Sequence, residues 1–185
     1  MKQLSFVKQY LMKPRSVGAI LPSSKYLANK MMEGIDFNRA TCIVEFGPGT
    51  GIFTDALLSR RKKNTKLILF ETNQEFCAIL KEKYQNEANL YIYHASAECI
   101  EEHLLHHDIQ SVDYIVSGLP FASLPSHVST QILHQTKRYL KNNGQFITFQ
   151  YTLFRKKFIG KFFRNIRTKR VFRNVPPAYV LFCTP

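Results

Sequence analysis

Five short apolar runs recur along the chain, and stretches with helical periodicity separate them. The runs cover residues 41–46, 67–71, 89–93, 112–117 and 145–150, and the helical stretches cover 52–61, 73–85, 97–107 and 126–141. Strand and helix alternating at this rhythm build a mainly parallel sheet with helices on both faces. The pattern therefore predicts a doubly wound, Rossmann-like α/β fold.

The two ends of the chain depart from this alternation. Residues 3–12 have the spacing of a short amphipathic helix that Pro14 ends, and a second helix is expected from Ser23 or Ser24 to Gly34. At the other end, "RTKRVFRNV", Pro176-Pro177 and "AYVLFCTP" are typical of two strands joined by a tight turn. We therefore expect an N-terminal helical segment over 1–34, a C-terminal antiparallel hairpin, and one domain over 1–185.

Three of the chain's 8 glycines, Gly47, Gly49 and Gly51, alternate directly after the first apolar run in "VEFGPGTG". Glycine permits positive φ and leaves the backbone open to a ligand. The loop lacks the Lys-Ser/Thr of a nucleotide triphosphate site, and its third glycine comes one residue early for a dinucleotide site. Glu71 ends the second run twenty residues later, where an acid accepts hydrogen bonds from ribose. A plain turn with a solvated Glu71 is the alternative, but the joint spacing favours S-adenosylmethionine.

Charge is unevenly distributed along the chain. The sequence has 26 basic and 13 acidic residues, a net charge of +13, and its last acidic residue is Asp113. Twelve Lys or Arg residues follow, nine of them between Arg155 and Arg173 among several phenylalanines. A stripe of one sign indicates a polyanionic partner, which is RNA, DNA or an anionic lipid surface. Residues 154–173 are called the basic aromatic segment below.

Other features narrow the class of protein. No apolar run approaches the roughly 18–20 residues needed to cross a bilayer, and the first residues do not resemble a signal peptide. The four cysteines are scattered and expected to be reduced, and "HLLHH" at 103–107 is interpreted as a solvated helix end, so no metal is expected. We expect a cytoplasmic protein.

The motif E-x-G-x-G-x-G from Glu45 to Gly51, with Glu71 after it, resembles class I S-adenosylmethionine-dependent methyltransferases. Their sheet has seven strands, and the last two form a hairpin. Three further stretches, at 15–31, 117–125 and 174–180, resemble bacterial phospholipid N-methyltransferases, which methylate phosphatidylethanolamine or related aminolipids. That group is itself similar to the rRNA adenine dimethyltransferases.

The resemblance implies roles for residues around the cofactor. Glu45 and the three loop glycines would contact S-adenosylmethionine, which leaves as S-adenosylhomocysteine, and Glu71 would bind the ribose. The families carry an Asp-Ala pair after the third strand that holds the adenine, and this chain has Ser96-Ala97 there. Serine can hydrogen-bond the adenine amine but offers no charge.

The stretch "SGLPF" follows the fourth apolar run, where the reacting atom must lie. Adenine N6-methyltransferases have Asn or Asp, then x-Pro and an aromatic residue, and the polar side chain accepts from the amine. Gly118 takes that position here, which leaves backbone carbonyls near Ser117 and Gly118 to orient an amine, with Phe121 as an aromatic wall. A small primary amine therefore fits better than adenine. Candidate bases for the amine proton are Tyr10, Tyr151 and His127.

The basic aromatic segment suits a membrane surface. Each Lys or Arg near an anionic leaflet contributes about 1 kcal/mol. Lys156, Lys157, Lys161 and Arg164 are the expected anion-binding residues, and Phe158, Phe162 and Phe163 are expected to enter the headgroup layer. The same charges would suit RNA phosphates.

We therefore expect a phosphatidylethanolamine or related aminolipid N-methyltransferase, peripherally bound at the inner face of the membrane. An RNA adenine N-methyltransferase is the alternative. Against it, 185 residues leave no room for the extra C-terminal helical domain that rRNA dimethyltransferases carry. A third alternative is a protein that binds the cofactor without turnover.

Overall fold

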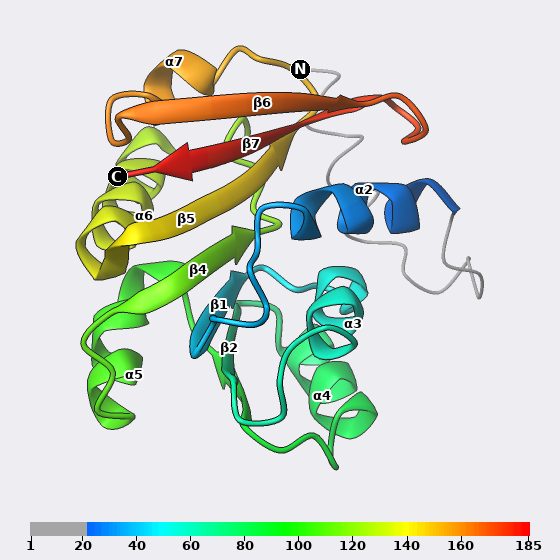
Figure 1. The fold of residues 1–185 in the computed structure, drawn as a ribbon, viewed down its shortest axis with the longest axis vertical. Helices are drawn as coiled ribbons and strands as arrows, with labels where there is room; N and C mark the ends of the chain where they lie inside the picture. The colour runs from blue at the N-terminus through cyan, green and yellow to red at the C-terminus, as the bar shows by residue number, and fades with distance from the viewer. Residues whose placement is uncertain (1–21) are drawn as a thin grey trace.

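A seven-stranded sheet runs through the molecule in the order β3-β2-β1-β4-β5-β7-β6 (Figure 1). The computed structural model describes residues 22–185, so the helix expected over 3–12 lies outside the described residues. The strands are β1 (Cys42–Phe46), β2 (Lys66–Glu71), β3 (Leu90–His94), β4 (Val112–Ser117), β5 (Leu140–Gln150), β6 (Asn165–Val171) and β7 (Ala178–Thr184). The predicted fold class, with its C-terminal hairpin, is confirmed.

The strand order reverses at β1, which defines the place where the fold can bind a ligand at the carboxyl end of the sheet. β1 pairs in parallel with β2 on one side and with β4 on the other, and β3 and β5 extend these pairs in parallel. β7 then runs antiparallel to both β5 and β6. The chain leaves β1 toward β2 but later returns to the other side of β1. Open α/β sheets bind their ligands in a crevice at such a reversal, which lies here beyond the carboxyl ends of β1 and β4.

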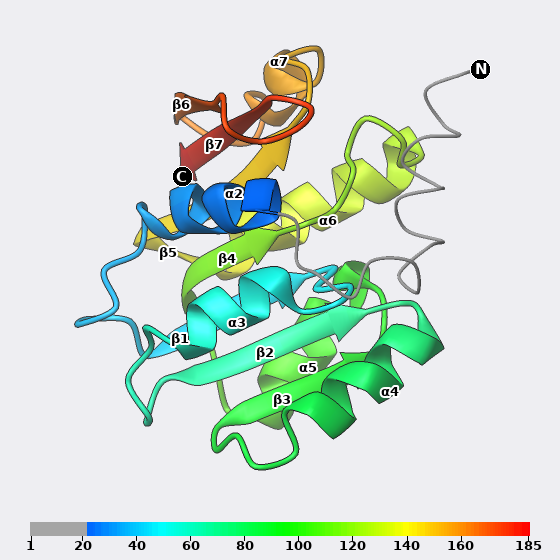
Figure 2. The ribbon, with the colours of Figure 1, turned by 90° about the vertical axis from the view of Figure 1, so that its right-hand side faces the viewer.

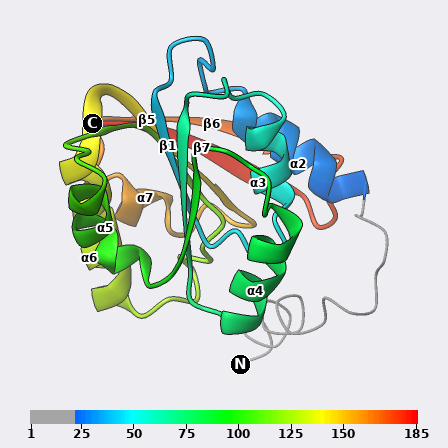
Figure 3. The same ribbon diagram turned by 90° about the horizontal axis from the view of Figure 1, so that it is seen from below.

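Helices cover both faces of the sheet, as the view along the sheet shows (Figure 3). α2 (Pro22–Met32), α3 (Ile52–Leu58) and α4 (Gln74–Lys83) lie on one face, and α5 (Ile100–His106), α6 (Ser126–Tyr139) and α7 (Lys156–Ile159) lie on the other. Alternate strand residues feed two cores: Val44 and Phe46 join the core beneath α5 and α6, whereas Ile43 joins the core beneath α2. The helices therefore leave only the loop edges open to ligands.

Asp113 ties three strands together at the opposite edge from the crevice. Its carboxylate accepts hydrogen bonds from the Thr41 and Cys42 backbone N–H groups and from Lys141 Nζ, at 2.6–3.0 Å. Burial opposes ionisation, but the bonds from Lys141 and the backbone outweigh it and hold the pKa of Asp113 below its usual value. This anchor fixes how β1, β4 and β5 align, and so how their carboxyl ends meet.

Several boundaries differ from those expected. α2 begins at Pro22, one residue before the predicted cap, because proline suits the first helical position, where its missing N–H costs nothing. The helix expected over 97–107 starts with a 3₁₀ turn, η2 (Ala97–Cys99), and β5 begins five residues earlier than predicted. The short helix α7 was not predicted. Within residues 22–185, no helix is long and apolar enough to cross a membrane.

Candidate functional site

The glycine loop joins β1 to α3 at the mouth of the crevice. Gly47, Gly49 and Gly51 have φ angles of +65°, +56° and +87°, all in the left-handed region that favours glycine. The Gly47 N–H donates to the Phe70 carbonyl and the Gly51 N–H to the Pro48 carbonyl, both at 2.9 Å. The loop is therefore a fixed turn, bonded to the end of β2.

The three glycines meet different surroundings. A Cβ at Gly47 would lie 2.8 Å from Leu119 Cδ2, and one at Gly51 would collide with the Tyr84 hydroxyl. A Cβ at Gly49 would meet no atom of the described residues within 4 Å. Gly47 and Gly51 are thus required by packing inside the protein, whereas Gly49 faces open space. The loop fits a ligand that lies against the backbone of Gly49.

Glu71 lies directly against this loop, as its position at the end of β2 predicts. The side chain is 7% exposed. One carboxylate oxygen accepts from the Gly49 N–H and the other from the Asn73 N–H, each at 2.9 Å. Each oxygen keeps a further lone pair, so the carboxylate can bridge the loop and the hydroxyls of a bound nucleoside.

Glu45 is fully buried at the base of the loop. Thr54 Oγ1 donates to its Oε2 at 2.8 Å, but its Oε1 has no hydrogen-bond partner in the described part of the chain. Burial raises the pKa of Glu45 to about 8, and the negative charge of Glu71 adds to this, while the bond from Thr54 opposes it. An orphaned buried oxygen marks a place where a cationic or hydrogen-bonding ligand group fits.

The structure places a carboxylate beside Ser96 that the sequence analysis missed. Ser96 caps η2, and its hydroxyl donates to Glu98 Oε2 at 3.0 Å. Ala97 is buried beneath this turn. Because η2 is a single 3₁₀ turn, it brings the side chain of Glu98, two residues after Ser96, back over Ser96. The only signal in the sequence was an acid two positions after the serine.

The segment after β4 packs backbone against backbone on the glycine loop. The Gly118 N–H donates to the Phe46 carbonyl at 2.8 Å, and a Cβ at Gly118 would lie 2.7 Å from the Gly47 carbonyl oxygen. Ser117 is fully buried, and its carbonyl accepts from Thr148 Oγ1 at 3.3 Å. Glycine at 118 is therefore a steric requirement, and this position has no room for an acceptor side chain.

Phe121 lies deeper than the predicted aromatic wall. It is fully buried and packs edge-on against Phe146, with ring centroids 6.1 Å apart. Leu119 and Pro120 are half-exposed instead. The contact of Phe121 with a substrate stays a prediction.

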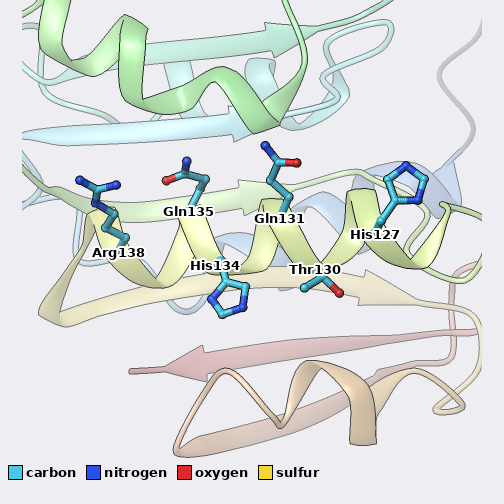
Figure 4. A pocket seen from close by; sticks show the side chains of 6 residues that line it. All are labelled: His127, Thr130, Gln131, His134, Gln135 and Arg138. Carbon is cyan, nitrogen blue, oxygen red and sulfur yellow. The ribbon is translucent and has the colours of Figure 1, made fainter.

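The candidate bases are separated. Tyr151 follows β5 at the carboxyl edge, where it packs edge-on against Phe149. His127 lies in a groove on the outer face of α6 with Gln131 and Arg138 (Figure 4), and Tyr10 lies outside the described residues. Gln150, at the end of β5, was missed: it is 5% exposed, and its Nε2 has no hydrogen-bond partner in residues 22–185. It adds a buried donor at the substrate side of the crevice.

The basic aromatic segment is only partly a surface feature. Lys157, Lys161 and Arg164 are exposed and Lys156 is half-buried. The expectation that Phe162 and Phe163 enter a headgroup layer is wrong for both, because they are buried in the core. Phe163 stacks on Phe146 with centroids 5.4 Å apart, and Phe162 packs against His134.

The histidines at 103–107 belong to a ring cluster rather than to a metal centre. His103 stacks on Tyr93, and the Tyr93 hydroxyl lies 2.6 Å from His107 Nε2. In the described part of the chain, no three His, Cys, Asp or Glu side chains come together in a way that would hold a metal ion.

Comparison with known proteins places this geometry in a class. A solved S-adenosylmethionine-dependent methyltransferase from Aquifex aeolicus shares the fold, with a TM-score of 0.65 and 16% identity over 88% of this chain and 92% of that one. The profile of the family described as ribosomal RNA adenine dimethylase matches residues 11–168. The protein is an S-adenosylmethionine-dependent methyltransferase. It belongs to the ribosomal RNA adenine dimethylase family.

Two curated relatives differ in how far the similarity extends. An ornithine lipid N-methyltransferase from Singulisphaera acidiphila is 27% identical over 180 residues, which cover 96% of this chain and 93% of that protein. A ribosomal RNA small subunit methyltransferase A from Mycoplasma capricolum is 32% identical over 114 residues, 60% of this chain but 38% of that protein. The specific resemblance to phosphatidylethanolamine N-methyltransferases stays a prediction.

Replacing Gly49 tests the position of the cofactor. Gly49→Val puts a branched side chain into the open space of the loop and strains a backbone at φ +56°. We expect S-adenosylhomocysteine binding to fall at least a hundredfold in isothermal calorimetry. Gly160→Ala, at the end of α7 with φ −62°, is the control and should bind normally. Native affinity in a folded Gly49→Val protein would place the cofactor elsewhere.

Glu45 generates a prediction on stability and pH. Its folded pKa of about 8 lies above the ordinary value of 4.5, so its stabilising effect is complete below pH 4.5 and is lost as the pH rises through 8. Each pH unit in that window lowers the free energy of unfolding by about 1.4 kcal/mol.

Glu45→Gln removes this titration while keeping the shape of the side chain. Urea unfolding from pH 5 to pH 8 should therefore show a flatter decline of stability for Glu45→Gln than for the native protein. Glu75→Gln, exposed on α4, should keep the native slope. Parallel curves for all three proteins would contradict a neutral, buried Glu45.

Proposed function

We propose that the protein transfers a methyl group from S-adenosylmethionine to the primary amine of an aminolipid, bound peripherally at the inner face of the cytoplasmic membrane. The observation that carries the proposal is the contact of Gly118 with the Gly47 carbonyl, which leaves no room for the side-chain acceptor that adenine N6-methylation uses. An amine on a flexible lipid headgroup needs no such side chain, because backbone carbonyls can orient it.

The acids and glycines at the strand ends would hold the cofactor. Gly49 leaves its backbone open to the methionine part, the orphaned oxygen of Glu45 lies beneath the loop, and Glu71 has lone pairs for the ribose. Because β3 lies next to β2 in the sheet, Ser96 and Ala97 would be in place to hold the base of a nucleoside bound at Glu71. Glu98 would then supply the charge that Ser96 lacks at the adenine amine.

When bound, S-adenosylmethionine supplies a methyl group on a positively charged sulfur. The accepting nitrogen must present a free lone pair, and an alkylammonium with a pKa of about 10.4 is neutral only about once in 10³ molecules at pH 7. The Gly118 carbonyl would orient the amine, and the Ser117 carbonyl, which accepts from Thr148 Oγ1, keeps a second lone pair for it. Positioning and exclusion of water by Leu119 and Pro120 would supply much of the rate.

The relatives support a lipid substrate and name a headgroup class. The similarity to the ornithine lipid N-methyltransferase covers almost the full length of both proteins. An ornithine-type lipid and phosphatidylethanolamine both present a primary amine next to an acyl anchor. The exposed charges of Lys157, Lys161 and Arg164 suit the anionic lipids around such a substrate.

RNA adenine methylation is the second candidate. The family match to ribosomal RNA adenine dimethylase favours it, as does the net charge of +13. Such an enzyme would have to hold its target adenine with backbone groups alone at Gly118.

Glu98 allows a test of how the cofactor is recognised. Losing a charged acceptor to an amine costs about 1.5–3 kcal/mol, so Glu98→Gln should weaken S-adenosylhomocysteine binding roughly ten- to a hundredfold. S-inosylhomocysteine carries an oxygen in place of the amine, so its affinity should not fall. Calorimetry on both ligands, with exposed Glu102→Gln as control, separates this role from a general loss of structure. Equal losses for the two ligands would contradict it.

One assay distinguishes the two candidate functions. Purified protein receives methyl-labelled S-adenosylmethionine with vesicles of phosphatidylglycerol mixed with phosphatidylethanolamine or with ornithine lipid, and in parallel with total RNA. We expect label in the organic phase, where chromatography counts the methyl groups. Gly118→Asn should lose this activity without gaining any on RNA. Label only in RNA, or in neither fraction, would overturn the proposal.

A further inference from the structure

Exposed apolar side chains gather in two loops at one edge of the sheet. Eight large hydrophobic side chains are exposed among the described residues, and five of them lie in the loop after β5 or in the turn between β6 and β7. Phe154 is 83% exposed, Phe172 70% and Val175 82%, with Leu153 at 41%. Tyr151 is the fifth. Exposed apolar residues this concentrated indicate an interaction surface.

Both loops leave the sheet at the edge that carries the glycine loop. Gln150, the last residue of β5, pairs with Tyr179 of β7, and Val171, the last residue of β6, pairs with Ala178. The two loops therefore start two strands apart, about 10 Å. Figure 1 shows the hairpin turn and the tips of β4 and β5 pointing the same way, and Figure 2 looks onto this edge.

The hairpin turn displays its apolar residues in a fixed arrangement. Asn174 is 4% exposed, and its side-chain N–H donates to the Pro176 carbonyl at 2.7 Å, which holds the turn closed. Arg170 lies over Phe172, with its guanidinium carbon 4.7 Å from the ring centroid. Because the turn is built before any partner arrives, little ordering is needed on binding.

Arginines surround the apolar residues. Arg155 follows Phe154 directly, Arg170 stacks on Phe172, and Arg173 follows Phe172 and lies over Tyr26 of α2. None of the three arginines forms an ion pair with a carboxylate in residues 22–185. Apolar residues flanked by cations that have no carboxylate partner match a bilayer with anionic headgroups, where aromatic rings enter the acyl boundary and guanidinium groups bind phosphates.

The predicted anion-binding residues Lys161 and Arg164 lie at the other edge. The Arg164 N–H donates to the Thr184 carbonyl at the far end of β7, and the neighbouring Asn165 pairs with Thr184. Val171 lies six positions after Asn165 along β6, which is about 20 Å of strand. A membrane bound at Arg164 alone would not meet the glycine loop, whereas one bound at Phe172 would.

We propose that Leu153, Phe154, Phe172 and Val175 form an insertion tip that enters an anionic bilayer. The tip turns the sheet edge that carries the glycine loop, called the cofactor edge below, toward the headgroups. The choice of a lipid partner rests on the proposed function. The tip brings the methyl donor to the membrane plane, so a lipid amine reaches Gly118 without leaving the bilayer. The cations of the α7 patch are the exposed Lys157, Lys161 and Arg164 and the half-buried Lys156, and we assign to them only long-range attraction.

Vesicle sedimentation of the full chain tests the tip. In phosphatidylethanolamine/phosphatidylglycerol vesicles at 0.5 M NaCl, where exposed charges are screened, Phe154→Ser/Phe172→Ser/Val175→Ser should lower the partition coefficient at least tenfold. Leu105→Ser, 62% exposed on α5, is the matched control and should bind normally. Neutralising the α7 patch to Gln should weaken binding only at low salt. Native binding by the triple variant, or an equal loss in the Leu105→Ser control, would overturn the proposal.

A fluorescence measurement keeps the test independent of the triple variant's folding. The chain has no tryptophan, so Phe154→Trp introduces a single probe at the tip. On adding vesicles, its emission should shift to the blue and be quenched by brominated acyl chains, while Leu105→Trp should not respond. A Phe154→Trp probe that responds to total RNA but not to vesicles would assign this surface to nucleic acid instead.

The tip and the proposed function can fail separately. Native protein that binds vesicles through the tip but methylates no aminolipid would overturn the function and leave the tip standing. The converse result is also possible to detect. If the native protein and the triple variant methylate vesicle lipids at equal rates, the tip is overturned. With a short-chain, water-soluble aminolipid, the triple variant should keep the native rate.

Discussion

The close contact between the loops after β1 and β4 determines what this site can recognise. The Gly118 N–H bonds to the Phe46 carbonyl, and the Gly118 Cα lies so near the Gly47 carbonyl that a Cβ would have no space. The two backbones therefore leave no space for a polar side chain at this position, so specificity for the accepting group must come from carbonyls and from how the substrate is presented.

The charge distribution of the sequence corresponds to two halves of the sheet. Residues 1–113 hold all 13 acidic residues, and they include β1, β2, β3 and the first two residues of β4. Glu45, Glu71 and Glu98 lie at or just beyond the ends of three neighbouring strands there, where they provide acceptor oxygens for the proposed cofactor. Residues 114–185, which include β5, β6, β7 and their connections, carry twelve Lys or Arg residues and no acid. The excess positive charge that suits an anionic surface is thus concentrated in this part of the chain.

The parallel strands and the glycine loop could be predicted because their signals are local: period, length and residues that permit positive φ. The roles of Phe162 and Phe163 could not, because they lie in the irregular turn between α7 and β6, and their burial depends on His134 and Phe146, which lie earlier in the sequence. Glu98 was missed for a similar reason, since only the 3₁₀ turn brings it back to Ser96. For Gly118, the sequence predicted the missing side chain, and the structure supplies the steric cause.

The proposed substrate is an alkylammonium at neutral pH, so the site would need a way to populate the free amine. Burial disfavours the charged form of an amine and lowers its pKa, and each unit gained raises the neutral fraction about tenfold. With the proposed tip in the bilayer, the space between Leu119, Pro120 and the lipid is partly closed to water. The same apolar contact that locates the enzyme then also favours deprotonation of its substrate. Recognition and activation of the amine would both follow from where the cofactor edge meets the membrane.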